Sequence, residues 1–427
     1  MSMHPERTSA ELLHFYKRHL NEVLLPFWQG AVDRNYGGVF TCFNNMGTTL
    51  VSRDKYVWSQ GRFVWLWSKI ADMCQRGVLD DDAGAYLEQA RKTAVFLKRR
   101  AILDNGNCAY LLMEEGDLKE AIPGQGHDIS FFVDCFVVLG FAGYAKAAGD
   151  AEVLEWALSL CDRIFTRVRL GGLRSEPYPV PEGLRAHSIP MILLHVAQEL
   201  TDALQAFHHD RASEFADWTR SFAEEILGTF LQPDGSIAEM IPVAANQFSD
   251  TVLTRHVNPG HTIECMWFIL HAAGQLDRTD WIPSATNTVK RAFEMGWDAK
   301  CGGLLRFVDQ DGGPPRGQQT GDAYEQLILD TWDTKLWWPH SEALYTTLLS
   351  YHLTQDAAFK QLYEQTHDYV FQTFPNPDTV VGEWIQIRDR QGQPVDKLVA
   401  LPVKDPYHII RNVLLTIELL HVQVMAS

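Results

Sequence analysis

The chain has 427 residues, of which 46% are hydrophobic and 21% charged, and its 54 acidic and 37 basic residues give a net charge of -17. This composition is typical of a globular protein with a large core, and the negative charge disfavours binding to nucleic acid or to an anionic membrane surface. The polar N-terminus lacks the pattern of a signal peptide, no apolar run is long enough to span a bilayer, and the seven cysteines show no CxxC spacing. We therefore expect a cytoplasmic protein with no membrane or nucleic-acid partner and no structural zinc site.

Six pairs of segments follow one another along the chain. Each pair begins with a short glycine-containing segment of alternating apolar residues, which predicts a strand or hairpin, and continues with a long apolar stretch, which predicts a buried helix. The short segments start at Gly37, Asn107, Gly171, Gly235, Gly302 and Gly382, and the apolar stretches start near Trp58, Ile129, Ile189, His261, Trp337 and His408. Between successive pairs lie amphipathic helices with one polar face, for example YLEQARKTAVFLKRR.

Direct similarity between two of these units indicates an internal repeat. DRNYGGVF from Asp33 is similar to DAKCGGLL from Asp298, and KYVW from Lys55 is similar to KLWW from Lys335. Six buried helices surrounded by six amphipathic ones predict an all-α fold, an (α/α)6 barrel with short β-hairpins at one mouth. A linear solenoid is the alternative, but it would expose an apolar face at each end. We treat residues 1–427 as a single catalytic domain.

Polar side chains gather at the predicted starts of the inner helices. Because the inner helices of such a barrel run parallel, their N-termini meet at one mouth, so these side chains converge on one cleft. Four of the six starts combine polar and aromatic residues: Trp58 with Arg62, His261 with Glu264, Trp337 and Trp338 with Glu342, and His408 with Arg411. A single histidine at a helix start is commonly a capping or core residue, and the recurrence at four starts is what favours a functional site.

The residue types in this cleft suit a sugar and a proton transfer. The indole rings of Trp58, Trp337 and Trp338 offer flat apolar faces for the C–H surface of a sugar ring. The charged groups of Arg62, Arg411, Glu264 and Glu342 offer partners for hydroxyls or for charge that develops during a reaction. Imidazole titrates near neutral pH, which suits His261 and His408 to general acid–base chemistry. His271 and His340 are weaker candidates, and His271 lies in an apolar stretch typical of a core helix.

At these motifs the sequence resembles the N-acylglucosamine 2-epimerase family, which includes mannose isomerases and cellobiose 2-epimerases. The resemblance covers nearly the whole chain and is most specific in NPGHTIECMWFIL and TKLWWPHSEAL, with YGGVFTCFNNMG, DKYVWSQGRFVWLWS and PYHIIR in support. It implies an (α/α)6 barrel, commonly a homodimer, and two acid–base histidines, here His261 and His408. It also implies that Arg62, Glu264, Trp338 and Arg411 line the sugar pocket.

Some relatives have a further functional histidine near the start of the third inner helix. Here Pro190, Met191 and Ile192 occupy that region, with His187 just outside it. We therefore do not assign His187 a catalytic role. The pattern is closer to the N-acylglucosamine branch, whereas GEWIQIRDR departs from that branch and leaves the exact sugar open.

The chemistry expected of these residues is C2 epimerisation without a cofactor or metal. One histidine removes the C2 proton of an open-chain sugar to give a cis-enediolate, and the other returns a proton to the opposite face. We expect Glu264 to hold one imidazole in its working tautomer, and Arg62, with Arg411, to stabilise the enediolate. The substrates are of the N-acetylglucosamine/N-acetylmannosamine type or the glucose/mannose type.

Three alternatives stay open at this stage. Return of the proton to C1 would make the protein an aldose–ketose isomerase of the mannose/fructose type. Glu264 and Glu342 could form the carboxylate pair of a glycoside hydrolase. The barrel could also bind a sugar or a protein without catalysis. The sequence contains no GxGxxG, P-loop, HExxH or GxSxG motif that would indicate other chemistry.

Overall fold

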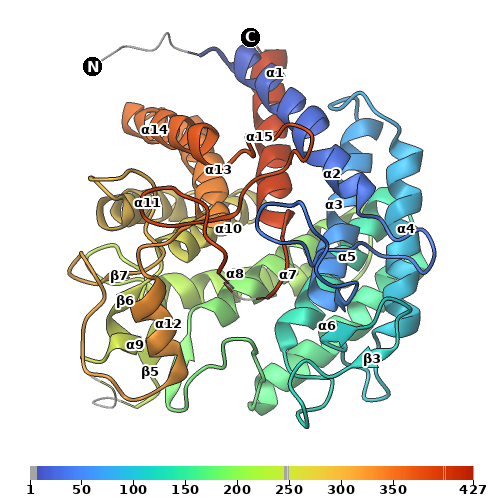
Figure 1. Ribbon diagram of the computed structural model, residues 1–427, viewed down its shortest axis with the longest axis horizontal. Helices are drawn as coiled ribbons and strands as arrows, with labels where there is room; N and C mark the ends of the chain where they lie inside the picture. The colour runs from blue at the N-terminus through green and yellow to red at the C-terminus, as the bar shows by residue number, and fades with distance from the viewer. Residues whose placement is uncertain (1–6, 245–247, 249, 398, 400, 427) are drawn as a thin grey trace.

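Six long helices form a closed inner ring in the computed structural model, which describes residues 7–244, 248, 250–397, 399 and 401–426 (Figure 1). The inner helices are α3 (Val57–Gln75), α5 (Phe131–Ala148), α7 (Ser188–Ala206), α10 (Pro259–Gln275), α13 (Trp337–Thr354) and α15 (Tyr407–Ala426). Each begins within two residues of its predicted start. Each also packs against the next, and α15 packs against α3, so the ring closes and the linear solenoid is wrong.

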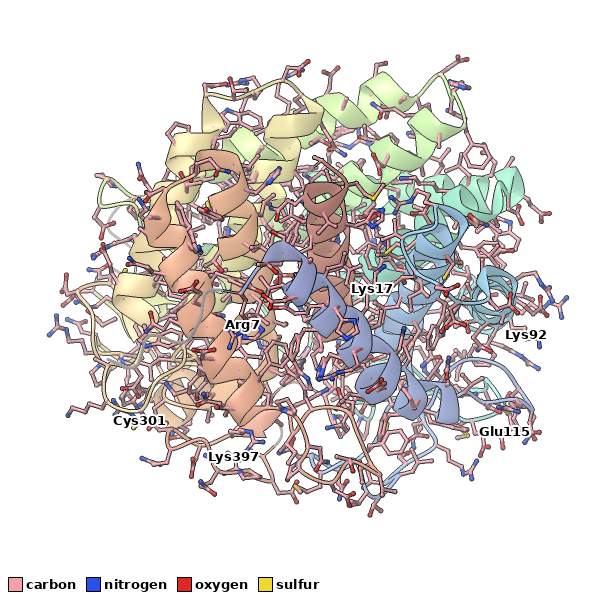
Figure 2. All side chains as sticks on the ribbon, turned by 90° about the horizontal axis from the view of Figure 1, so that it is seen from above. Arg7, Lys17, Lys92, Glu115, Cys301 and Lys397 are labelled. Carbon is pink, nitrogen blue, oxygen red and sulfur yellow. The ribbon has the colours of Figure 1, made fainter. Side chains whose placement is uncertain are left out.

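An outer helix covers each inner one. The outer helices are α1 (Ser9–His19), α4 (Ala83–Arg100), α6 (Ala151–Leu170), α8 (Ala212–Glu225), α11 (Trp281–Gly296) and α14 (Ala357–Thr373). The outer helix α1, which comes first in the chain, packs on α15, which comes last. In the view from above in Figure 2, α1, which carries the labelled Lys17, lies at the front of the molecule. Short elements extend α1 and α8 or lie near the mouth: π-turns Leu20–Leu24 and Ile226–Phe230, α2 (Leu25–Gly30), α9 (Val252–Arg255) and α12 (Ala323–Thr331). The all-α (α/α)6 barrel is confirmed.

The predicted hairpins form in part. Isolated antiparallel bridges such as Val32–Val39 and Trp297–Leu304 close local turns, but most strand pairs join two successive units. The antiparallel pairs are β1 (Lys55–Tyr56) with β2 (Leu111–Leu112), β4 (Leu184–Ala186) with β5 (Met240–Pro242), β6 (His256–Val257) with β7 (Val308–Asp309), and β8 (Lys335–Leu336) with β9 (Ile387–Arg388). Within the described ranges, β2 and β3 (Leu118–Lys119) make the one hairpin between named strands.

The pairing between units has a physical reason at the helix starts. A strand that leads directly into an inner helix has backbone N–H and C=O groups that need partners. The short segment of the next unit lies at the same mouth and supplies them. The pairing then continues to the helix itself, since the Trp337 N–H donates to the Gln386 carbonyl at 3.0 Å and the His187 N–H donates to the Glu239 carbonyl at 2.9 Å. Residues of the short segments are thereby placed beside the first turns of the inner helices.

The internal repeat corresponds to two buried ion pairs. Lys55, which is completely buried, places its Nζ atom 2.6 Å from Asp33 Oδ2. Lys335, equally buried, places its Nζ atom 3.4 Å from Asp298 Oδ2. Each lysine also donates to a glycine carbonyl of the turn that begins with its aspartate, at 2.8 Å and 3.0 Å respectively. The two similar segments therefore form the same ion pair, which joins a turn to the strand that precedes an inner helix.

Among the residues that the structure describes, two helices have the length and apolar composition that a membrane span requires. They are α5 and α15, and 72% and 50% of their most apolar windows are buried inside the barrel. Such helices are expected here because an inner helix contacts other helices on nearly all sides. Their composition is accounted for by the barrel core.

Candidate active site

Two histidines and a tryptophan meet at the N-terminal ends of three inner helices. The Trp338 ring, in the first turn of α13, lies 5.2 Å from the His261 ring of α10 and 5.7 Å from the His408 ring of α15, between ring centroids. The three residues are 147 positions apart at most, so their meeting confirms that the inner helix starts converge. All three side chains are partly exposed, which leaves them accessible to a ligand.

Local sequence explains how α10 presents His261. Asn258 caps the helix, because its side chain accepts the His261 N–H at 3.2 Å, and Pro259 occupies the first helical position. Gly260 lets Trp338 pack directly on the helix backbone: a Cβ atom at this position would lie 2.6 Å from the Trp338 ring. The NPGH motif therefore supplies the helix cap, the first turn of α10 and the surface on which Trp338 packs.

Glu239 holds the His261 imidazole. Its Oε2 atom lies 3.0 Å from His261 Nδ1, and its side chain is 5% exposed, against 28% for that of His261. Burial lowers the pKa of His261, but the charge and hydrogen bond of Glu239 and the charge of Glu264 raise it above its ordinary value. Burial raises the pKa of Glu239, but the positive charge of His261 and the nearby His187 hold it well below its usual range. An ionised Glu239 fixes the proton of His261 on Nδ1, which leaves Nε2 for chemistry.

His187 lies behind this pair. Its Nδ1 atom is 3.6 Å from Glu239 Oε1, and among the described residues neither ring nitrogen has a hydrogen-bond partner. The β4–β5 register, in which Ala186 pairs with Met240, brings His187 opposite Glu239. The His187 ring is completely buried. It therefore lies against the Glu239 carboxylate and is shielded from the mouth of the barrel.

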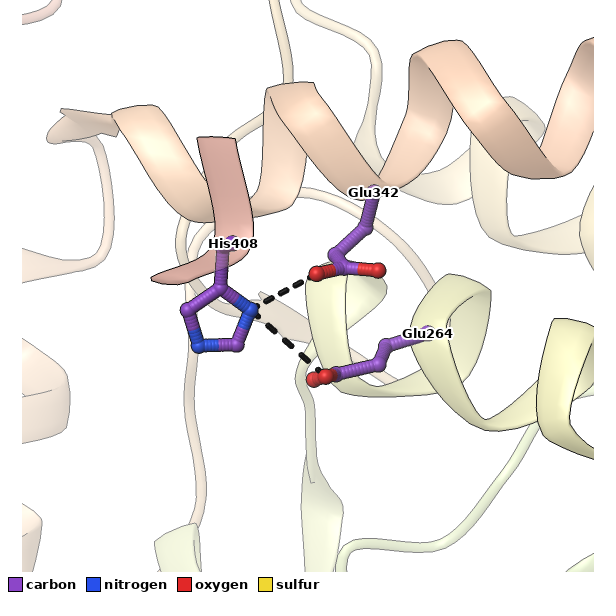
Figure 3. Close-up of side chains that lie close together, drawn as sticks. All are labelled: Glu264, Glu342 and His408. Atoms are coloured by element: carbon purple, nitrogen blue, oxygen red, sulfur yellow. Dashed lines mark hydrogen bonds and ion pairs between the residues drawn. The ribbon is translucent and has the colours of Figure 1, made fainter. Parts of the chain in front are cut away.

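His408 is held by a buried cluster of charges (Figure 3). Its Nδ1 atom lies 2.6 Å from Glu342 Oε1 and 3.5 Å from Glu264 Oε1. Arg411 donates to both carboxylates, and its distance to Glu342 Oε1 is 2.6 Å. Burial raises the pKa of Glu342, but the charge of Arg411 and the hydrogen bond of His408 hold it well below its ordinary range. As at His261, the carboxylate takes Nδ1 and leaves Nε2 for a ligand.

The same cluster has the spacing of a metal site. The ligand atoms of Glu264, Glu342 and His408 lie within 4.8 Å of one another. Arg411 already supplies a positive charge between the two carboxylates, and a metal ion would have to displace it. The arrangement is therefore explained as a guanidinium-bridged pair that orients an imidazole.

Arg62 and Trp58 lie on α3 at the same mouth. Arg62 forms a buried ion pair with Asp405, and its guanidinium carbon lies 4.8 Å from the centre of the Trp58 ring. Asp405 in turn accepts the Tyr407 N–H at 2.9 Å and donates its own N–H to the Gln386 side chain at 3.0 Å. Arg62 therefore anchors the segment that leads into α15 and fixes the start of the helix that carries His408.

Several residues expected to contact the sugar are placed differently. Glu342 and Arg411 are 0% and 1% exposed, because they lie a turn further into the barrel than the exposed first-turn residues. Trp337 is buried in the hydrophobic core, with no ring contact to either histidine among the described residues. Glu264 was expected to hold an imidazole; its 3.5 Å approach to His408 is longer than that of Glu342, which is the principal partner.

The weaker histidine candidates have structural partners. His340 is completely buried and accepts the Leu304 N–H at 2.8 Å, and burial lowers its pKa to about 3. His271 lies 2.7 Å from the Tyr345 hydroxyl, and burial lowers its pKa to about 4. His340 is a core residue, and His271, which is partly exposed, lies on an apolar inner helix as its sequence context predicted.

The sequence analysis missed Glu239, Asp405 and Arg306. All three lie outside the inner helices, in segments that precede a strand or a helix at the mouth. The available signal was the short segment GSIAEMI, in which a single glutamate stands among apolar and small residues. Its relevance depends on the β4–β5 register, which no local pattern revealed.

Fold and site together define the class of this protein. Two imidazoles, each bound to a carboxylate through Nδ1, flank one indole ring at the mouth of a helical barrel, an arrangement suited to proton transfer on a ligand with an apolar face. Comparison with known proteins agrees. The profile of the family described as N-acylglucosamine 2-epimerase (GlcNAc 2-epimerase) matches residues 38–412. The protein therefore belongs to the N-acylglucosamine 2-epimerase family, whose members are carbohydrate epimerases and isomerases.

Individual relatives are similar over nearly their whole length. The N-acylglucosamine 2-epimerase of Bos taurus is 28% identical over 418 residues, which cover 95% of this chain and 90% of the relative. The cellobiose 2-epimerase of Ruminococcus albus is 22% identical over 418 residues, covering 92% and 95%. Among solved structures, the cellobiose 2-epimerase from Spirochaeta thermophila has a TM-score of 0.76 at 18% identity, covering 99% and 100%. A D-mannose isomerase has a TM-score of 0.73 at 17% identity, covering 97% and 100%.

Proposed function

We propose that this protein is a sugar 2-epimerase whose foremost substrate pair is N-acetylglucosamine and N-acetylmannosamine. The observation that carries this proposal is the pair of imidazoles on Trp338, each with Nδ1 held by a carboxylate and Nε2 without a partner among the described residues. The higher identity to an N-acylglucosamine 2-epimerase, 28% against 22% for a cellobiose 2-epimerase, favours the N-acyl pair over cellobiose.

The reaction proceeds on the open-chain sugar. The Nε2 atom of one histidine takes the C2 proton, the electrons of the C2–H bond form a C1=C2 double bond, and the carbonyl oxygen on C1 becomes an enolate oxygen. The intermediate is an enediolate only for sugars that carry a hydroxyl on C2, such as glucose and mannose. The second histidine delivers a proton to the opposite face of C2, and the double bond reverts to a carbonyl. Because His261 and His408 both lie beside Trp338, both imidazoles are close to a sugar bound against that ring.

The decisive experiment is a sugar conversion in D2O followed by NMR. N-acetylglucosamine, N-acetylmannosamine, glucose, mannose and cellobiose are each incubated with the protein, and we expect the C2 epimer of a substrate with deuterium at C2. A ketose product would assign the aldose–ketose isomerase instead, and a product of lower mass would assign a hydrolase. Binding of all five sugars without conversion would leave only a binding function.

Substitution of each histidine tests its role. His261→Asn and His408→Asn should each lower kcat by about 10²- to 10⁴-fold, the usual contribution of general acid–base catalysis. Circular dichroism should show an intact helical fold in both variants. Near wild-type turnover in either variant would remove that histidine from the mechanism.

The remaining properties are proposed on the family resemblance. We propose that the enzyme needs no metal ion or cofactor, acts as a homodimer and resides in the cytoplasm. Activity retained after dialysis against EDTA would support the first property, because Arg411 already bridges the carboxylates that a metal would bind. Sedimentation equilibrium measures the second, and fractionation of the native cells the third.

A further inference from the structure

A buried arginine that the sequence analysis did not single out lies at the same mouth. Arg306 precedes β7 by two residues, and β7 pairs with β6 with Val308 opposite Val257. Val257 comes two residues before Pro259, where α10 begins, so the β6–β7 pair places the segment that contains Arg306 near the start of this helix. The arginine therefore lies beside the helix turn that carries His261.

Arg306 differs from the other two mouth arginines in its partners. Its side chain donates to the Thr331 hydroxyl at 2.9 Å and to the Tyr178 hydroxyl at 3.4 Å, and it is 5% exposed. Among the described residues, no carboxylate lies within ion-pair distance of it. Arg62 and Arg411, in contrast, are paired with Asp405 and with two glutamates.

The Arg306 guanidinium carbon also lies 4.9 Å from the centre of the Phe307 ring, so its contacts are a ring face and two neutral hydroxyls. A buried cation without an ionised partner is costly unless a ligand supplies negative charge. The charge of Arg306 reaches the reaction centre, because it opposes the carboxylates Glu239 and Glu264 in setting the pKa of His261. Paired charges such as Arg62–Asp405 have little net field to offer a reaction intermediate, whereas an unpaired guanidinium retains its full attraction. We therefore expect the negatively charged partner of Arg306 to form on the bound sugar during the reaction.

We propose that Arg306 donates to the enolate oxygen on C1 and is the principal group that stabilises the intermediate. The proposal rests on the proposed epimerase function and replaces Arg62 and Arg411 in this role. When the C2–H bond breaks, the proton moves to an imidazole Nε2 and the electron pair is delocalised onto the C1 carbonyl oxygen, which becomes negative. Arg306 binds this oxygen until a proton returns to C2, and no electrons leave the sugar.

The test compares Arg306→Gln with Arg185→Gln, a matched control at an exposed arginine paired with Glu225. Loss of one oxyanion donor costs about 10²- to 10³-fold in kcat, so we expect that loss for Arg306→Gln, with KM changed by less than about threefold. C2 deuterium exchange should slow by the same factor, because exchange requires the enolate intermediate. Arg185→Gln should retain wild-type values.

Two further variants separate the charge from a structural role. Guanidinium added to Arg306→Ala should restore part of the lost kcat, and Thr331→Val, which removes only a hydroxyl partner, should stay within about tenfold of wild type. Unchanged kcat in Arg306→Gln would overturn the proposal. So would a loss confined to KM with anionic sugars, which would assign Arg306 to a charged substituent. A wild-type protein that converts no sugar would instead refute the proposed function, so the two failures are distinct.

Discussion

The two active-site imidazoles share one arrangement although they lie on different helices. In each, Nδ1 faces a buried carboxylate, Glu239 for His261 and Glu342 for His408. The carboxylate fixes the tautomer and stabilises the imidazolium that forms when Nε2 accepts a proton. The two sites differ in their surroundings, because Arg411 neutralises part of the charge at His408, whereas the unpaired Arg306 lies near His261.

Glu239→Gln tests this arrangement at His261. Glu239 raises the pKa of His261, so its neutralisation should lower that pKa and move the corresponding limb of the kcat/KM profile to lower pH. With the tautomer no longer fixed, kcat should fall by about 10²-fold. The measurement is the pH dependence of kcat and kcat/KM between pH 5 and 9 (about two units on either side of neutrality).

Glu418→Gln is the matched control, since it neutralises another carboxylate near the opposite end of α15 from His408. We expect its pH profile to coincide with that of the wild type. A Glu239→Gln profile shifted to higher pH, or unshifted, would contradict the role of Glu239.

At the scale of helices, the close contact of α10 and α13 positions the sugar-binding face. A Cβ atom on Gly260 would lie 2.6 Å from the Trp338 ring and 2.9 Å from Pro339 Cβ. Gly260→Ala should therefore displace Trp338 from between the two imidazoles, lower kcat/KM by about tenfold and destabilise the fold by about 1 to 3 kcal/mol. Steady-state kinetics and urea denaturation measure the two effects.

Gly274→Ala, on the same helix, provides the comparison. A Cβ atom there has no heavy atom within 4 Å, so this variant should be as active as the wild type and no less stable. Equal behaviour of the two variants would refute the steric account of Gly260.

The buried lysine–aspartate pairs that join turns to strands give a second prediction at the scale of helices and strands. Lys55→Met removes the partner of Asp33, which is 4% exposed, and an unpaired buried carboxylate costs about 3 to 5 kcal/mol. The double variant Asp33→Asn with Lys55→Met should recover part of this loss in urea denaturation. Lys92→Met, at an exposed lysine of α4 (Figure 2), should change stability by less than about 1 kcal/mol. A loss no larger than that of Lys92→Met would show that the buried pair is dispensable.

The sequence predicted the inner helices of the barrel more completely than the contacts between side chains at its mouth. Long apolar stretches after six short glycine-containing segments predicted the six inner helices, and the first turns of those helices contain His261, Trp338 and His408. Glu239 and Arg306 were not predicted as site residues, because they lie in short segments whose neighbours are determined by strand pairing between successive units. Glu342 was recognised but given a sugar-binding role, since spacing along a helix does not say how deeply the helix is buried.

At the scale of the whole molecule, the first and last inner helices must stay together for the mouth to exist. Glu418 on α15 binds Lys69 of α3 at 2.6 Å and also pairs with Arg76, just beyond the end of that helix. These contacts close the ring at the end opposite the histidines, because they involve the C-terminal parts of both helices. They are the charged counterpart of the apolar packing between α3 and α15.

Glu418→Gln should therefore reduce stability by about 1 kcal/mol, as expected for partly exposed ion pairs, without changing kcat. Burial raises the pKa of Glu418, but Lys69 and Arg76 lower it below its ordinary value of 4.5. A depressed carboxyl pKa stabilises the fold above the unfolded-state pKa, and this contribution is lost as the pH falls through the folded-state value. Urea denaturation should thus give a constant difference from wild type between about pH 6 and 8 that vanishes in acid. Glu214→Gln breaks a local pair between the first turn of α8 and Arg211, the residue before that helix, and should cost only a few tenths of a kcal/mol. An equal cost for both variants would mean that ring closure depends on packing alone.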